Sequence, residues 1–270
     1  MKKLYYIILA ILMVLLCHGF AFGKEETYMD KLMMSEPNPK NRLVSGLTDG
    51  RLSVIAAYKM WVAEWQSFSF RSGGTVPTQF TSDTNFFSGP SITAAYRFRD
   101  SEWFHSAGAN FTYLTASGWE FSDSVAGAAG SIKAKRRDLS FTGSIAIWRG
   151  IGIFAGYYNS KQNLNIFNVK FVGPLIGMYG SGALNKWLGL YGNLAVAFLD
   201  YKFVGGSTIS NDTLGYSTEW GFNINGPDFW KVGTGLQIGY RAQVITVEEN
   251  PNLTANDITW GPIFSIVAKF

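Results

Sequence analysis

Long segments with period-two alternation are the feature of this sequence that most constrains its fold. From Val232 to Val244 the even positions are apolar or Thr, whereas the odd positions from Lys231 to Gln243 are Gly, Gln, Lys and Arg. Successive side chains of a strand point to opposite faces, so this segment predicts a strand with one apolar and one polar face. A soluble sandwich also alternates, but here the segments run for about ten residues or more, as a transmembrane barrel requires.

The alternation predicts ten strands, with eight or twelve as the alternatives. Their connections are tight after the second, fourth, sixth and eighth segments, and longer and polar after the first, third, seventh and ninth. Short turns at one end and long loops at the other are typical of outer-membrane barrels. We therefore expect an all-β protein, a closed antiparallel up-and-down transmembrane β-barrel over residues 51–270. The ten segments are 51–69, 86–99, 103–117, 134–149, 151–161, 166–184, 187–203, 213–224, 229–246 and 258–270.

Composition excludes several other classes of protein. Only 16% of the residues are charged, against about 25% in an ordinary soluble domain, which argues against disorder and against nucleic-acid-binding tails. The mean hydropathy is only +0.06 despite 43 aromatic residues (9 Trp, 13 Tyr and 21 Phe), because apolar residues alternate with Ser, Thr, Asn and Gly. We predict no nucleic-acid partner.

The N-terminus has the features of a secretory signal peptide. Lys2 and Lys3 precede an uncharged apolar stretch from Leu4 to Cys17, and small residues before position 24 suit cleavage after Gly23. An uncleaved helical anchor is the alternative. Cleavage removes the only cysteine and leaves 21 Lys+Arg against 19 Asp+Glu, too small an excess to indicate a polyanionic partner. Residues 24–50 then form a periplasmic N-terminal segment, either disordered or an ordered plug.

A weak internal repeat runs through the predicted strands. Gly-Pro pairs occur at 89–90, 173–174 and 261–262, and Trp103 and Trp187 each follow the proline by 13 residues. Trp103, Trp187 and Trp230 each have Gly five residues on. We expect these three indoles to form an aromatic girdle at one membrane rim, where Trp favours the headgroup layer.

The end of the chain carries a family resemblance. Phe264, Ile266, Ala268 and Phe270 alternate with other residues up to the terminus. Together with the signal peptide and the alternating strands, they resemble a single-chain bacterial outer-membrane β-barrel, whose last strand ends in an aromatic residue read by the barrel assembly machinery. The resemblance implies that outer-membrane lipid and this machinery are partners. An even number of strands places both termini in the periplasm.

A helical membrane protein is the rival interpretation. Residues 171–199 contain one charge, Lys186, and are apolar enough to suggest a span. The six Gly and one Pro in this stretch would strongly destabilise a helix, whereas strand alternation continues through them and Asn185-Lys186 suits a turn. We therefore prefer strands.

Residues that carry chemistry are sparse, so we predict no enzyme activity, no metal site and no cofactor. Omptin surface proteases resemble this chain in strand number, but they use paired Asp and an Asp/His couple, and the sequence contains no Asp-x-Asp or Asp-x-His. Lipid A deacylase barrels use His and Ser. His105 and Ser106 are adjacent on a strand and must point to opposite faces, so they cannot act as a pair.

The lumen is the remaining candidate site. The alternation places charged side chains and amides on the inner face, and buried charges must pair or stay hydrated. A barrel near the eight-strand size is nearly filled by side chains, so the lumen is either plugged by paired groups or a narrow pore, which four cations to one acid would make anion-favouring. The inward-facing candidates are Lys59, Arg97, Glu219, Arg241 and Lys269, with Asn110, Asn193, Asn223, Gln237 and Gln243.

These observations predict a structural barrel or a passive small-solute channel. The alternative is a surface-binding module that holds an extracellular ligand through the loops 70–85 and 116–133, the second of which contains Trp119 and Phe121. A lipid- or peptide-hydrolysing barrel is the third interpretation.

Overall fold

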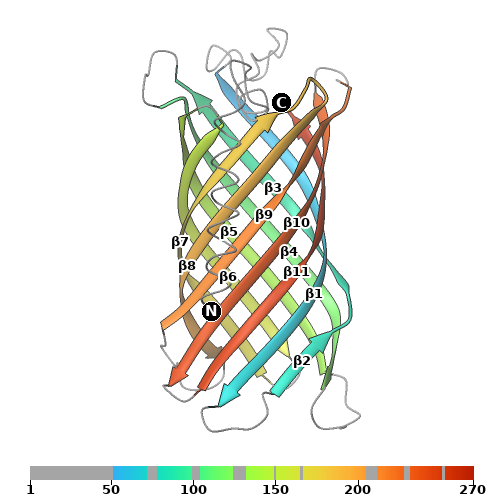
Figure 1. The fold of residues 1–270 in the computed structure, drawn as a ribbon, viewed down its shortest axis with the longest axis vertical. Coiled ribbons are helices and arrows are strands. Elements are labelled where there is room, and N and C mark those ends of the chain that lie inside the picture. The colour runs from blue at the N-terminus through green and yellow to red at the C-terminus, as the bar shows by residue number, and fades with distance from the viewer. Residues whose placement is uncertain are drawn as a thin grey trace.

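The protein folds into a single closed β-barrel (Figure 1). The computed structural model describes residues 51–71, 78–98, 104–123, 132–148, 150–164, 167–204, 212–227, 232–250 and 253–270. The predicted signal peptide and the segment 24–50 lie outside the described residues. The strands are β1 (Leu52–Arg71), β2 (Thr78–Ser82), β3 (Asn85–Arg97), β4 (Ser106–Asp123), β5 (Ile132–Trp148), β6 (Ile151–Leu164), β7 (Phe167–Ala183), β8 (Leu188–Val204), β9 (Asp212–Asn225), β10 (Gly233–Asn250) and β11 (Leu253–Lys269).

Ten strands close the barrel, as the alternation predicted. β11 pairs antiparallel with β1, and every other neighbouring pair is antiparallel as well. The short β2 lies beside β1 in line with β3, and their register against β1 shifts by one residue between Ala63↔Asn85 and Gln66↔Thr81. β2 therefore continues the second barrel strand beyond an irregularity and does not add an eleventh.

The strands are strongly staggered around the barrel. Following paired residues once around from Ile55 of β1, through Thr93, Asn110 and on to Asp257, returns to β1 at Ser67, twelve residues further along. For ten strands this stagger tilts each strand by about 40° to the barrel axis. We call the end where β1 begins and β11 ends the terminal end (at the top of Figure 1), and the opposite end the loop end.

The strands reach further at the loop end than the sequence predicted. β4 continues to Asp123 and β5 begins at Ile132, so most of the predicted loop 116–133 is strand, and the predicted loop 70–85 contains β2. The long polar connection predicted after the ninth segment was wrong, because Asn250 of β10 pairs with Leu253 of β11. Outward-facing residues become polar at the edge of the apolar surface, but the strands do not end there. Strand pairing continues wherever backbone N–H and C=O groups find partners.

The helical alternative for residues 171–199 was wrong, because this stretch forms most of β7 and β8. The turn between them is stabilised by Asn185, whose Oδ1 accepts the backbone N–H of Trp187 at 2.8 Å and of Leu188 at 2.9 Å. Asn competes for local backbone donors in this way, which is why it is common in turns. Among the described residues no helix has the length and apolarity needed to cross a membrane.

The three Gly-Pro pairs form the same local structure in β3, β7 and β11. Each proline is exposed on the outer face and lies opposite a tyrosine of one neighbouring strand, which is β1, β6 or β10. On the other side of the proline strand, the backbone pairing with β4, β8 or β1 is interrupted next to the Gly-Pro pair. A Cβ on each glycine would come within about 2 Å of a carbonyl oxygen of that other neighbour, so only glycine allows this close approach. The pairs are Pro90↔Tyr58, Pro174↔Tyr157 and Pro262↔Tyr240.

The outer surface of the barrel carries an apolar band. Its exposed side chains come from all around the barrel and include Phe141, Ile153, Ile176, Phe198 and Ile266. Apolar residues outside and polar residues inside are the arrangement that a bilayer imposes on a spanning barrel. Near the terminal end the exposed Trp187 and Trp148 lie at the edge of this band, whereas Trp103 and Trp230 of the predicted girdle are outside the described residues.

The C-terminal residues close the barrel. Ile266 and Phe270 are exposed on the outer face, whereas Ile263, Ser265 and Val267 of the same strand are buried in the lumen. The backbone N–H of Phe270 donates to the carbonyl oxygen of Val54 at 2.9 Å, so the last residue still pairs with β1.

Candidate functional site: the barrel lumen

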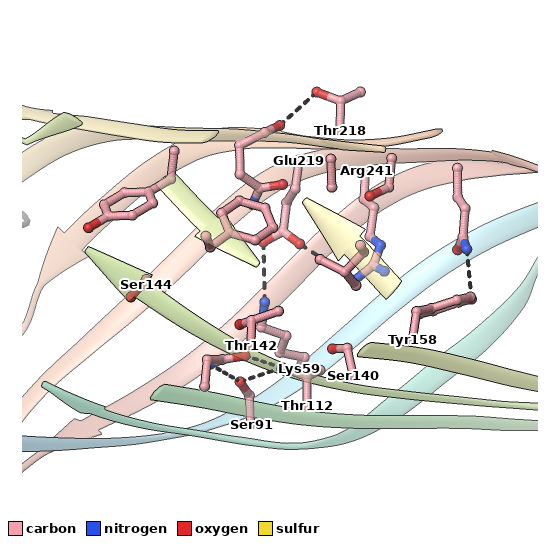
Figure 2. A pocket seen from close by; sticks show the side chains of 18 of the residues that line it. Lys59, Ser91, Thr112, Ser140, Thr142, Ser144, Tyr158, Thr218, Glu219 and Arg241 are labelled. Atoms are coloured by element: carbon pink, nitrogen blue, oxygen red, sulfur yellow. Dashed lines mark hydrogen bonds and ion pairs between the residues drawn. The ribbon is translucent and has the colours of Figure 1, made fainter. Parts of the chain in front are cut away.

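The candidate site is the barrel interior, where three of the predicted charged residues meet. Lys59 Nζ lies 3.3 Å from Glu219 Oε1, and Arg241 Nη1 lies 3.6 Å from Glu219 Oε2. These residues come from β1, β9 and β10, and Figure 2 shows both cations directed at the same carboxylate. The buried Glu219 is thus flanked by two cations, which offsets the cost of removing its charge from water.

The other predicted inward residues lie apart from this triad. Gln237 donates through Nε2 to Asn223 Oδ1 at 2.8 Å. Arg97 and Lys269 are half-buried near the terminal end. Asn110 joins a hydroxyl network of β3 and β4, in which its Nδ2 donates to Thr93 Oγ1 at 2.7 Å and Ser91 Oγ lies 2.8 Å from Thr112 Oγ1.

A second ionic cluster, centred on Arg136 of β5, crosses the lumen nearer the loop end. Arg136 is completely buried, and its Nε and Nη2 each donate to Asp138 at 3.0 Å. Nη1 donates to Thr259 Oγ1 at 2.7 Å and to Asp257 Oδ1 at 3.4 Å. Both acceptors belong to β11 on another part of the barrel wall, so the guanidinium group joins distant strands through the interior.

Side chains from other strands complete the Arg136 cluster. Gln243 Oε1 of β10 accepts from Arg136 Nη2 at 3.0 Å, and Gln243 Nε2 donates to the hydroxyl of Tyr158 at 2.7 Å. Asp257 Oδ2 accepts from Trp65 Nε1 and from Gln162 Nε2, each at 2.9 Å. A buried ionic group is tolerated when its donors and acceptors are satisfied in this way.

Aromatic rings pack against the same guanidinium group. Arg136 Cζ lies 5.4 Å from the ring centroid of Trp65 and 5.3 Å from that of Phe87, both within cation–π range. The ring of Trp119 is 5.5 Å from Trp65 and 5.3 Å from Phe87. With Trp61, these rings form a fully buried apolar cluster inside the barrel. The rings and the Arg136 cluster together fill this section of the lumen, and we call them the plug.

Trp119 was wrongly predicted to belong to a surface loop. The register of β4 against β5 shifts between Ser117 and Trp119, and Gly118 has a φ of 82°. This bulge re-aims the strand, because one extra residue reverses the alternation. As a result Trp119 is buried in the plug and is not available to a ligand at the surface.

A cavity of about 290 Å³ lies inside the barrel beside the plug (Figure 2). One wall is polar and carries hydroxyl groups of β3, β4 and β5, such as Ser91, Thr112 and Thr142. Another wall, from β6 to β8, is apolar and includes Leu175 and Leu199. The Lys59–Glu219–Arg241 triad forms the charged part of the lining.

The sequence pattern did not lead us to predict most of the acidic side chains in the lumen. It predicted four inward cations and one acid, and the described residues add the cation Arg136 and the acids Asp138 and Asp257. The signal was available, because Asp257 has the same parity as Lys269 in the last strand, but that strand was predicted to begin at residue 258. The extra acids weaken the argument for an anion-favouring pore.

Catalytic chemistry finds little support in the described residues. The buried Ser106 lies on the lumenal side of β4, and the preceding His105 is only half-buried. No group of three or more His, Cys, Asp or Glu capable of holding a metal occurs within the described ranges. The absence of enzyme activity and of cofactors stays a prediction.

Comparison with known proteins gives structural matches only. No protein-family model matches the chain, and neither does any curated protein. The outer-membrane protease OmpT from Escherichia coli is 11% identical with a TM-score of 0.43, over 81% of this chain and 96% of that one. The translocator domain of the autotransporter NalP from Neisseria meningitidis is 13% identical with a TM-score of 0.39, over 92% and 99%. Ail of Yersinia pestis is 15% identical with a TM-score of 0.27, over 80% and 98%.

Likeness at this level concerns the layout of strands and carries no information about activity. The class of the protein follows from its own structure, which is a closed antiparallel ten-stranded barrel with an apolar outer band and a polar, partly filled interior. These are the features of an outer-membrane β-barrel.

Proposed function

We propose that this protein is a structural outer-membrane barrel whose lumen is sealed, so that it does not conduct small solutes in this state. The observation that carries the proposal is the complete burial of Arg136 within the lumen. A solute moving along the barrel axis would have to displace a guanidinium group with partners on β5, β6, β10 and β11. Disrupting such a group leaves buried charges without partners, which is costly.

Passive passage of small solutes is the second candidate function. It is favoured by the cavity, whose polar and charged walls could hold water and a small polar molecule. Passage would require the plug to move aside, whereas a structural barrel needs no such movement. The two candidates therefore differ in whether the wild-type protein conducts.

Single-channel recording on the refolded full-length chain distinguishes them. We expect the wild-type protein to be silent and the double variant Arg136→Ser/Asp257→Ser, which removes one cation and one acid from the plug, to give discrete conductance steps. The matched control is Arg137→Ser on the adjacent, exposed position. Folding of each variant is checked by its heat-modifiable gel mobility. Conductance by the wild-type protein would overturn the proposal, and a folded but silent double variant would show that the Arg136 cluster is not the seal.

We further propose that both termini are periplasmic and that the loop end faces the cell exterior. Support comes from the even number of barrel strands and from the tight turn at Leu184–Trp187 at the terminal end. Asp83, at the loop end, and Lys186, at the terminal end, are both exposed. Asp83→Cys should react with an impermeant thiol reagent on whole cells, whereas Lys186→Cys should not, and the reverse pattern would refute this orientation.

A further inference from the structure

A row of cations crosses four neighbouring strands on the outer surface of the barrel. In the register of the sheet Arg137 of β5 lies opposite Lys161 of β6, Lys161 lies opposite Lys170 of β7, and Lys170 lies opposite Lys202 of β8. We call these four residues the cationic row.

The side chains of the cationic row point away from the lumen. Arg137 lies between the buried Arg136 and Asp138, and Lys161 lies between the buried Ser160 and Gln162. Lys170 and Lys202 likewise follow residues that are buried in the lumen. Because side chains alternate along a strand, all four face outward.

Positive charge on the outer surface is concentrated on this side of the barrel. Lys133 and Lys135 of β5 extend the row toward the loop end and are exposed. No other outward-facing strand position among the described side chains carries Lys or Arg, and the outward faces of β9, β10, β11 and β1 have none. The cations are therefore a local feature of β5 to β8.

Four adjacent cations are unfavourable without a counter-charge. Residues directly opposite in an antiparallel pair have Cβ atoms about 4.5–5.5 Å apart, and like charges there destabilise the sheet. Within the described part of the chain Asp200 Oδ2 lies 3.9 Å from Lys202 Nζ, and Glu120 Oε1 lies 3.9 Å from Lys133 Nζ. The described acids form no ion pair with Arg137, Lys161 or Lys170. An anion from outside the chain would remove this repulsion.

The cationic row lies at the edge of the apolar band. Toward the terminal end, beyond the outward-facing Asn159 of β6 and Asp200 of β8, the outward residues of the same strands are apolar and include Phe141, Tyr157, Ile176 and Phe198. With strands tilted by about 40°, a row perpendicular to them climbs about 3 Å per strand, or about 9 Å from Arg137 to Lys202. This rise is similar to the depth of one layer of lipid headgroups.

We propose that the cationic row binds the phosphate groups of a lipid whose headgroup carries more than one phosphate, in the leaflet that surrounds the loop end. Arg137 can hold a phosphate through two parallel N–H donors, and the lysines provide point charges along the row. The acyl chains would then lie on the apolar residues just below. The inference needs the barrel to span a membrane, but it depends neither on a sealed lumen nor on which end faces outward.

Lipid binding to the refolded full-length protein in detergent micelles tests the proposal. The probe is diphosphoryl lipid A, with monophosphoryl lipid A and phosphatidylglycerol as comparison lipids, and retention on the protein is measured by native mass spectrometry. We expect diphosphoryl lipid A to bind most tightly, with weaker binding at high salt. Equal retention of the three lipids would overturn the proposal, since it would indicate only a general attraction to anionic surfaces.

Matched substitutions locate the site. Lys161→Gln and Lys161→Gln/Lys170→Gln alter outward-facing side chains, and Lys186→Gln, in an exposed turn at the terminal end, is the control. We expect the Kd for diphosphoryl lipid A to rise about fivefold for each lysine of the row that is removed, with no change for Lys186→Gln. Unchanged affinity in the folded double variant, or an equal loss in the control, would refute the assignment.

Discussion

Replacing Arg136 by Met tests how much the plug contributes to stability. The substitution removes two 3.0 Å hydrogen bonds to Asp138, one of 2.7 Å to Thr259 and one of 3.0 Å to Gln243. Asp257 keeps donors from Trp65 and Gln162, whereas Asp138 has no other donor among the described contacts. Removing one partner of a buried ion pair costs about 3–5 kcal/mol, because the remaining charge stays buried.

We therefore expect Arg136→Met to lower the free energy of unfolding by about 4 kcal/mol. The measurement is urea unfolding in vesicles of zwitterionic lipid, which contain no anionic lipid for the cationic row, and it is followed by Trp fluorescence. Arg137→Met is the control, since Arg137 is exposed on the outer face, and we expect a change within about 0.5 kcal/mol. Adding Asp138→Leu to Arg136→Met should restore part of the lost stability, because it removes the unpaired charge. A loss below about 1 kcal/mol, or equal losses for the two arginines, would refute this account of the plug.

Two further predictions concern backbone pairing and barrel closure. Gly173→Ala should strongly reduce the yield of folded barrel, because the added Cβ would lie 1.9 Å from the carbonyl oxygen of Phe198. The control Gly182→Ala in the same strand should fold normally, because no atom lies within 4 Å of its added Cβ. Equal yields of the two variants on heat-modifiable gels would contradict the close approach at the Gly-Pro pairs. Phe270→Asp should lower the amount of protein in the outer membrane more than Lys269→Ala does, because the Phe270 side chain is exposed on the apolar outer surface and its backbone pairs with Val54. Quantitative blotting of membrane fractions measures this amount. Similar levels for both variants would refute the role assigned to the terminal ring.

The strands, their order and the closed barrel could be predicted from the amino-acid sequence alone. Alternation between polar and apolar residues is a local property of each strand, and it can be read without knowing the neighbouring strands. It also placed Lys59, Glu219 and Arg241 on the inner face, although it did not show that they meet. The strand ends at the loop end were missed, because backbone pairing there continues past the apolar band.

The side-chain contacts across the lumen and along the outer surface could not be predicted from the sequence, because they depend on how the strands pair around the barrel. Arg136 and Asp257 are 121 positions apart and are joined through the closed barrel. The cationic row exists because three successive registers place Arg137, Lys161, Lys170 and Lys202 opposite one another. A shift of one residue in any of them would pair a cation with a position that faces the lumen. Register is set by the pairing of all ten strands around the closed barrel, and no single segment of sequence contains that information.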